Sequence, residues 1–177
     1  MTLAVLAPLL SVVLAVSLPG WWHRAPVFPA VAAGVLGVAI LVAASAPSVG
    51  RLALIVCTTL AVMASAAGGG PLTVAILQRA SASTTPRTHE PGRPDPTPAE
   101  DVLRGGAWIG ALERLAVTAT LIAGWPEGIA VVLAVKGLAR YPELRSPGAG
   151  ASERFIIGTF TSVLWAAACA VTVLLLR

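Results

Sequence analysis

Long runs of residues without charge constrain this chain more than any other feature of its sequence. Three such runs occupy the first half, at residues 2–18, 27–46 and 52–77. An α-helix needs about 20 apolar residues to cross roughly 30 Å of hydrocarbon, so each run is a candidate membrane span. With 56% hydrophobic and 11% charged residues, the chain has too little polar surface to cover a water-soluble fold. We therefore predict an all-α, polytopic transmembrane helical bundle.

The third run is interrupted by Gly68, Gly69, Gly70 and Pro71. Proline removes a backbone hydrogen-bond donor, and glycine lowers helix stability. The segment is therefore either a short span followed by a surface turn or one long helix broken at the proline. We expect the short span with a loose end.

Three further candidate helices follow in the second half, at residues 107–124, 127–141 and 155–176. The last is a clean apolar run, but the first two contain Glu113, Arg114 and Lys136. The second of them is only about 22 Å long at 1.5 Å per residue. These two segments are either full spans in a locally thinned bilayer or a re-entrant hairpin. We expect five to six spans in total.

The stretch at residues 81–101 separates the two halves, with five prolines, four threonines and alternating charges in place of aliphatic residues. Such a composition buries too little apolar surface to offset the entropy lost on ordering, so we predict a disordered linker. The expected organisation is a three-span region at 1–78, a Pro/Thr-rich linker at 79–106 and a charged hairpin with a last span at 107–177.

The distribution of Lys and Arg predicts the orientation. With six crossings, Arg51 and Arg177 fall on one side of the membrane. The other side holds nine basic residues: Arg24, Arg79, Arg87, Arg93, Arg104, Lys136, Arg140, Arg145 and Arg154. Cytoplasmic loops carry an excess of Lys and Arg, so we expect a cytoplasmic linker and outward-facing termini. The Ala-, Arg-, Gly-, Pro- and Val-rich composition is typical of a GC-rich bacterium, which indicates a bacterial plasma membrane.

Two charged residues are predicted to meet inside the membrane. Glu113 lies 12 residues before Trp125, and Lys136 lies 11 residues after it. In an antiparallel hairpin that turns near Trp125, both side chains sit roughly 17 Å from the turn and can pair. Ionisable groups inside a bilayer cost several kcal/mol unless they are satisfied, and they often mark function. The pair is therefore either a structural ion pair that fixes helix register or part of a proton or substrate pathway.

Other charged residues extend this pair into a candidate intramembrane polar site, which consists of Glu113, Arg114, Lys136, Arg140, Glu143, Glu153 and Arg154. Adjacent helical residues point in different directions, so Arg114 is not expected to share the Glu113 contact. We expect it to meet Glu153 or a lipid phosphate.

Small and polar residues recur at three- and four-residue steps on two of the predicted helices. The expected packing positions are Gly106, Gly110, Thr120, Gly158 and Ser162. Small residues at this spacing allow a neighbouring backbone to approach closely, although such patterns also arise by chance in Ala- and Gly-rich spans. We expect the last helix to pack against the charged hairpin, and these faces to serve protein partners or a homo-oligomer.

The sequence contains no complete constellation for catalysis or metal binding. His23 and His89 are isolated, and no nucleophile elbow, phosphate-binding loop or dinucleotide fingerprint occurs. We therefore predict no catalytic residue, no metal, no cofactor and no nucleic-acid partner. Cys57 and Cys169 lie in apolar spans at similar depth, and they are either two buried thiols or a disulfide.

Charged residues at fixed places in apolar surroundings carry a resemblance to a known family. The three motifs are W-I-G-x-L-E-R at 108–114, A-x-K-x-x-A-R-Y-x-E-L at 134–144 and E-x-F-x-I-G-T at 153–159. Over these roughly 50 residues the chain resembles the C-terminal part of an uncharacterised family of bacterial integral membrane proteins. The resemblance implies a membrane location and a charged helical hairpin, with no established activity.

The expected function is that of a non-enzymatic accessory or scaffold subunit of a bacterial membrane complex, with the lipid bilayer as its surroundings. One alternative is a small ion-coupled transporter that uses Glu113 and Lys136. A second is a lipid-binding or lipid-modifying enzyme at the inner interface, where the seven-residue polar site would hold anionic headgroups.

Overall fold

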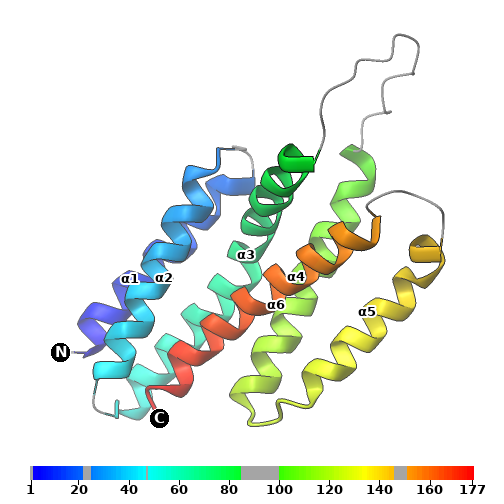
Figure 1. Cartoon of the computed structure of the whole chain (residues 1–177). Coiled ribbons are helices and arrows are strands. Elements are labelled where there is room, and N and C mark those ends of the chain that lie inside the picture. Colours follow the sequence, from blue (N-terminus) through cyan, green and yellow to red (C-terminus); the bar gives the residue numbers. More distant parts are fainter. Residues whose placement is uncertain (1, 22–24, 47, 85–99, 146–150) are drawn as a thin grey trace.

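The computed structural model describes residues 2–21, 25–46, 48–84, 100–145 and 151–177 (Figure 1). The described residues form an all-helical bundle, as predicted. Its elements are α1 (Thr2–Ser17), a 3₁₀ helix η1 (Pro19–Trp21), α2 (Val27–Ser45), α3 (Arg51–Thr84), α4 (Glu100–Ile122), α5 (Gly128–Arg145) and α6 (Ala151–Leu174).

The six α-helices alternate in direction along the chain. Both chain ends lie at one end of the bundle, whereas α3 ends and α4 begins at the other (Figure 1). Helices α3 and α6 have the most extensive contact with each other. Helices α1 and α2 form a second pair that packs against α3 and α6, and α4 also packs against both of these helices. Helix α5 contacts α4 and, more weakly, α6, and no other described element. It therefore forms the edge of the bundle.

Among the described residues, four helices are long and apolar enough to cross a membrane. These candidate spans are Leu3–Trp21, Val27–Ser45, Arg51–Ala80 and Ser152–Leu174. Helices α4 and α5 form an antiparallel pair of 23 and 18 residues. The turn between them uses Gly124 at φ +76°, a conformation that glycine adopts without steric penalty.

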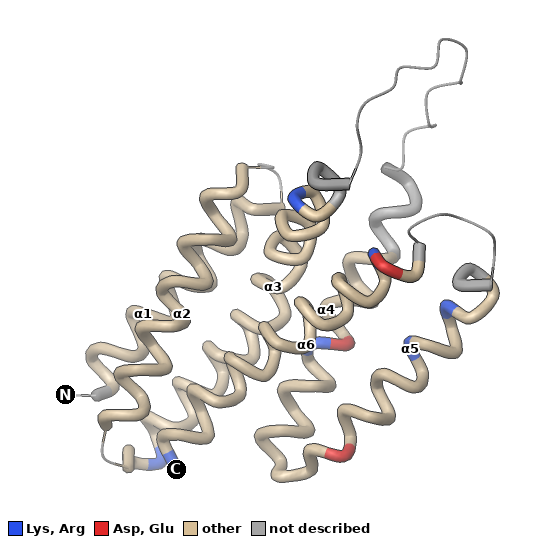
Figure 2. Tube along the Cα trace, viewed as in Figure 1, with Lys and Arg blue, Asp and Glu red and all other residues tan. Residues whose placement is uncertain are grey.

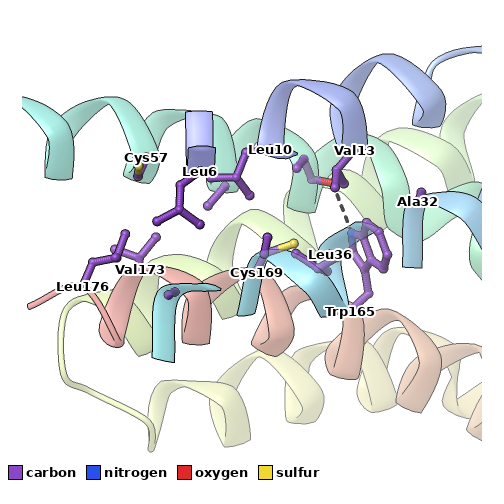
Figure 3. Packing of buried hydrophobic residues seen from close by; sticks show 14 residues of the cluster. Leu6, Leu10, Val13, Ala32, Leu36, Cys57, Trp165, Cys169, Val173 and Leu176 are labelled. Atoms are coloured by element: carbon purple, nitrogen blue, oxygen red, sulfur yellow. Dashed lines mark hydrogen bonds between the residues drawn. The ribbon is translucent and has the colours of Figure 1, made fainter. Parts of the chain in front are cut away.

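The apolar core lies where α1, α2, α3 and α6 meet, and Figure 3 shows its side chains. Leu6 and Leu10 of α1 are fully buried in the same cluster as Val173 of α6. Cys57 and Cys169 belong to this cluster and are free thiols, so the structure favours buried thiols over a disulfide.

Helix α3 runs without interruption through Gly68, Gly69, Gly70 and Pro71, so the expected short span with a loose end is wrong. The reason lies in the neighbouring helices, because each glycine makes room for a large side chain. A Cβ atom at Gly68 would meet Trp165, one at Gly69 would meet Arg114 and one at Gly70 would meet Trp21. The glycines thus serve helix packing and do not end the helix.

Pro71 leaves the carbonyl of Ala67 without its helical N–H partner, because proline has no backbone donor. The indole Nε1 of Trp21 donates to this carbonyl at 3.0 Å. We expect Trp21→Phe to lower the free energy of unfolding by about 1 kcal/mol, since it removes the donor but keeps an aromatic ring. The measurement is thermal unfolding in detergent, followed by a thiol-reactive dye that reports exposure of Cys57 and Cys169.

The control for this prediction is the same change in a Pro71→Ala background, where the alanine supplies the missing N–H. The loss caused by Trp21→Phe should shrink there. Equal losses in both backgrounds would show that the indole stabilises the bundle by packing alone.

Helix α6 packs against α4, as expected for the charged hairpin, but it packs more extensively against α3. A Cβ atom at Gly158 of α6 would meet Thr73 at 3.5 Å and Leu77 at 3.7 Å, so this glycine packs against α3. Ser162 also lies on α6 and faces Arg114 of α4, whereas Gly106, Gly110 and Thr120 lie on α4 itself. Gly106 has open space around it, and a Cβ atom at Gly110 would lie 3.2 Å from the side chain of Arg114 on the same helix. Thr120 supports the α4–α5 turn, since its side chain lies against Gly128.

Candidate intramembrane polar site

The expected pair between Glu113 and Lys136 is present. Lys136 Nζ donates to Glu113 Oε2 and forms an ion pair between α4 and α5. Glu113 lies nine residues before the end of α4, and Lys136 lies eight residues after the start of α5. The side chains are 17% and 21% exposed, respectively. The pair therefore joins the two helices near their middle and is only partly covered by the bundle.

Arg114 points away from this pair and into the bundle, and its 3% exposure makes it a buried residue. Its Nε donates to the carbonyl of Ser65 at 2.9 Å, and its Nη2 donates to that of Ala66 at 2.6 Å. Its Nη1 donates to Ser162 Oγ at 3.3 Å. One arginine thus ties α4 to both α3 and α6. Consecutive helical residues are turned by about 100°, so when Glu113 faces α5 its neighbour faces inward.

The expectation that Arg114 meets Glu153 or a lipid phosphate is therefore wrong. Glu153 lies exposed in the first turn of α6. The arginine contact on α6 is Ser162, nine residues further along and about 13 Å away at 1.5 Å per residue. The acceptors that replace a carboxylate are the backbone carbonyls of α3, which the glycine run leaves accessible.

Two hydroxyl side chains extend the polar contact between α3, α4 and α6. Ser65 Oγ and Thr118 Oγ1 share a hydrogen bond of 2.7 Å, and Thr118 also donates to the carbonyl of Ala166 at 3.3 Å. Both residues are fully buried. Neither residue belongs to the site predicted from the sequence. The available signal was their place on apolar helices, where a hydroxyl group needs a partner on a neighbouring helix.

Four consecutive carbonyls on α3 accept hydrogen bonds from side chains of other elements. Trp165 Nε1 donates to Ala64 at 3.1 Å, Arg114 donates to Ser65 and Ala66, and Trp21 donates to Ala67. The glycines lie one helical turn further on, next to the same three side chains. We call this arrangement the donor collar of α3. The glycines and Pro71 have low helix propensity, and it is at this segment of α3 that side chains of η1, α4 and α6 meet.

A small pocket opens between α4, α5 and α6. Glu113, Arg114 and Lys136 line it, together with Thr159 and Ser162 of α6. Its volume of about 10 Å³ is close to what one water molecule requires. Thr159 Oγ1 is buried and has no hydrogen-bond partner among the described residues. The charged groups that line the pocket are two cations and one carboxylate.

The structure does not gather all seven residues of the expected site. Glu113, Arg114 and Lys136 lie in the middle of their helices and line one pocket. Arg140 lies five residues before the end of α5, and Arg154 lies in the first turn of α6, like Glu153. Figure 2 shows the same separation between charges in the middle and charges at the helix ends. The side chain of Glu143 lies outside the described residues.

In the part of the chain that the structure describes, His, Cys, Asp and Glu do not form a group of three or more that would hold a metal ion. His23 and His89 fall outside that part. The buried polar groups described above all contact other protein groups except Thr159 Oγ1. The described residues place a charged pair beside a small pocket at this site.

No protein-family model, curated protein or solved structure matches this chain. The resemblance of residues 108–159 to a bacterial membrane protein family accordingly stays a prediction.

Proposed function

We propose that this protein is a non-enzymatic accessory or scaffold subunit of a bacterial plasma-membrane complex. The observation that carries the proposal is the set of contacts made by Arg114, a cation that the bundle buries. Its hydrogen bonds all go to α3 and α6, so it fixes the arrangement of three helices. A buried charge whose hydrogen bonds hold neighbouring helices together supports a structural role, because buried ionic groups can specify one helix packing over others.

The proposed topology has six spans, with the linker in the cytoplasm and both termini outside. It is supported by the alternating helix directions and by the position of both chain ends at one end of the bundle. The excess of Lys and Arg at the opposite end supports the same orientation. Helices α4 and α5 would span as an antiparallel pair in which Glu113 and Lys136 neutralise each other.

The test is deletion of the gene, followed by native electrophoresis of membranes solubilised in mild detergent. A scaffold should migrate in an assembly well above its own 17.9 kDa, and its loss should lower the size or abundance of that assembly. Re-expression of the wild-type chain should restore both. Migration of the chain alone, together with unchanged membrane complexes in the deletion strain, would contradict the proposal.

A small ion-coupled carrier is the second candidate, and one observation favours it. The unpartnered hydroxyl of Thr159 lies in the pocket beside Glu113 and Lys136, where a transported proton or ion would find polar groups. Purified protein in proteoliposomes with a pH-sensitive dye tests this candidate. A carrier would move protons in the wild type and lose that activity in Glu113→Gln, whereas a scaffold would show no flux in either.

A further inference from the structure

The charged pocket lies on a side of the bundle that is only partly covered. Helix α5 stands at the edge and contacts α4 and α6 alone among the described elements. Lys136 and Glu113 are 21% and 17% exposed near the middle of their helices. In a membrane, hydrocarbon would surround these exposed parts, and it offers a charged pair no solvation. A covering group from another molecule would remove this cost.

The net charge of the pocket indicates what that covering group carries. Arg114 and Lys136 each contribute one positive charge, and Glu113 contributes one negative charge. The sum is one uncompensated positive charge. A carboxylate from outside the chain that joins Lys136 would bring this sum to zero in a low-dielectric site, where the attraction between opposite charges is strongest.

The depth of the pocket along α5 limits which molecule can supply this carboxylate. Lys136 lies about 12 Å along the axis from the start of α5 and about 13 Å from its end, at 1.5 Å per residue. A lipid headgroup at the membrane surface does not lie at this depth, whereas the middle of a transmembrane helix does. A second copy of this chain fits poorly, because Glu113 already pairs with Lys136. The other described carboxylates with defined side chains, Glu127 and Glu153, lie at helix ends.

We propose that the pocket face formed by α4, α5 and α6 docks a transmembrane helix of a partner protein, and that this helix carries one Asp or Glu near its middle. The inference rests on the proposed scaffold function and names the chemistry of the partner. The partner carboxylate would approach Lys136 from the exposed side. Apolar side chains of the partner would cover Val132 and Leu133, which line the same pocket.

The first experiment places a photo-crosslinking amino acid at Leu133 of the full-length chain in native membranes. The matched control carries it at Leu41 of α2, which is 71% exposed and lies on a helix that has no contact with α4 or α5. We expect one protein adduct from position 133 that is absent at position 41. Mass spectrometry should place the crosslink in a transmembrane segment of the partner that contains a carboxylate.

The second experiment uses charge variants to test the sign of the interaction. Lys136→Met removes the exposed cation and should lower the yield of the adduct at least about tenfold. Glu113→Gln increases the positive charge of the pocket and should keep or raise the yield. Lys136→Arg should preserve it. A purely structural role of the ion pair predicts equal losses for Lys136→Met and Glu113→Gln, because both break the same pair.

Several results would overturn the inference. They are an adduct to lipid or to a second copy only, a partner segment without a carboxylate, and equal losses in the two charge variants. If Lys136→Met does not fold in the thiol-reactivity assay, conversion of the partner carboxylate to its amide tests the same contact with the wild-type chain. Native electrophoresis separates the two proposals, because an intact assembly without the expected adduct leaves the scaffold function standing.

Discussion

Alanine at Gly68 or Gly69 should destabilise the bundle, although alanine normally strengthens a helix. We expect each change to lower the free energy of unfolding by about 2 kcal/mol, a typical cost of overpacking. A Cβ atom at Gly68 would lie 2.8 Å from Ser17 Oγ and from Trp165 Cε2. One at Gly69 would lie 2.8 Å from Arg114 Nε, which is held by its bonds to α3. All three neighbours hold hydrogen bonds that a shift would strain: Ser17 to Val13, Trp165 to Ala64 and Arg114 to Ser65.

The matched control is Gly34→Ala on α2, where an added Cβ would meet nothing within 4 Å. Alanine there should be neutral or stabilising by up to about 1 kcal/mol, because glycine is the weaker helix former. The thiol-reactive dye assay in detergent gives the unfolding midpoints, with Cys57 and Cys169 as its buried reporters. A gain of stability at Gly68 or Gly69 similar to that at Gly34 would contradict the close packing of the donor collar.

Arg114→Lys should destabilise the protein by about 3 kcal/mol, which is more than expected for a change that keeps the charge. The guanidinium reaches two carbonyls of α3 and Ser162 of α6 at the same time through its planar fork. An ammonium group is compact and cannot reproduce this geometry. It would remain a desolvated charge with fewer partners, and a buried charge that loses its partners costs several kcal/mol.

Arg114→Met provides the comparison, because it has a long side chain without charge. We expect a smaller loss than for lysine, since both the hydrogen bonds and the cost of burying the charge disappear. The unfolding midpoints of the two variants in the same detergent decide the order. A lysine variant as stable as the wild type would mean that charge alone, and not the guanidinium geometry, holds α3, α4 and α6 together.

The pairing of Glu113 with Lys136 could be predicted from the sequence because it depends on distances along the chain. The rise of a helix and the position of the turn near Trp125 place both residues at one height. The structure contains this pair. The helices could be predicted from the apolar runs for the same reason. A run of about 20 apolar residues is long enough to cross a membrane as a helix, whatever the rest of the chain does.

The contacts of Arg114 and of the glycine run depend instead on which helices become neighbours. In isolation, three glycines and a proline are the residues of a helix break. Beside Trp21, Trp165 and Arg114 they become the surface on which those side chains rest. The partners Ser65 and Thr118 were likewise not predictable, because their bond joins residues that are 53 positions apart.

The apolar helices, and the equal height of an acid and a base in the charged hairpin, follow from the amino-acid sequence, because helix geometry and hydrophobicity are local properties. The inward turn of Arg114 and the continuation of α3 through its glycines depend on contacts between helices. Both outcomes require other helices, which supply acceptors for the guanidinium and a donor for the free carbonyl of Ala67, and such contacts exist only once the bundle has assembled.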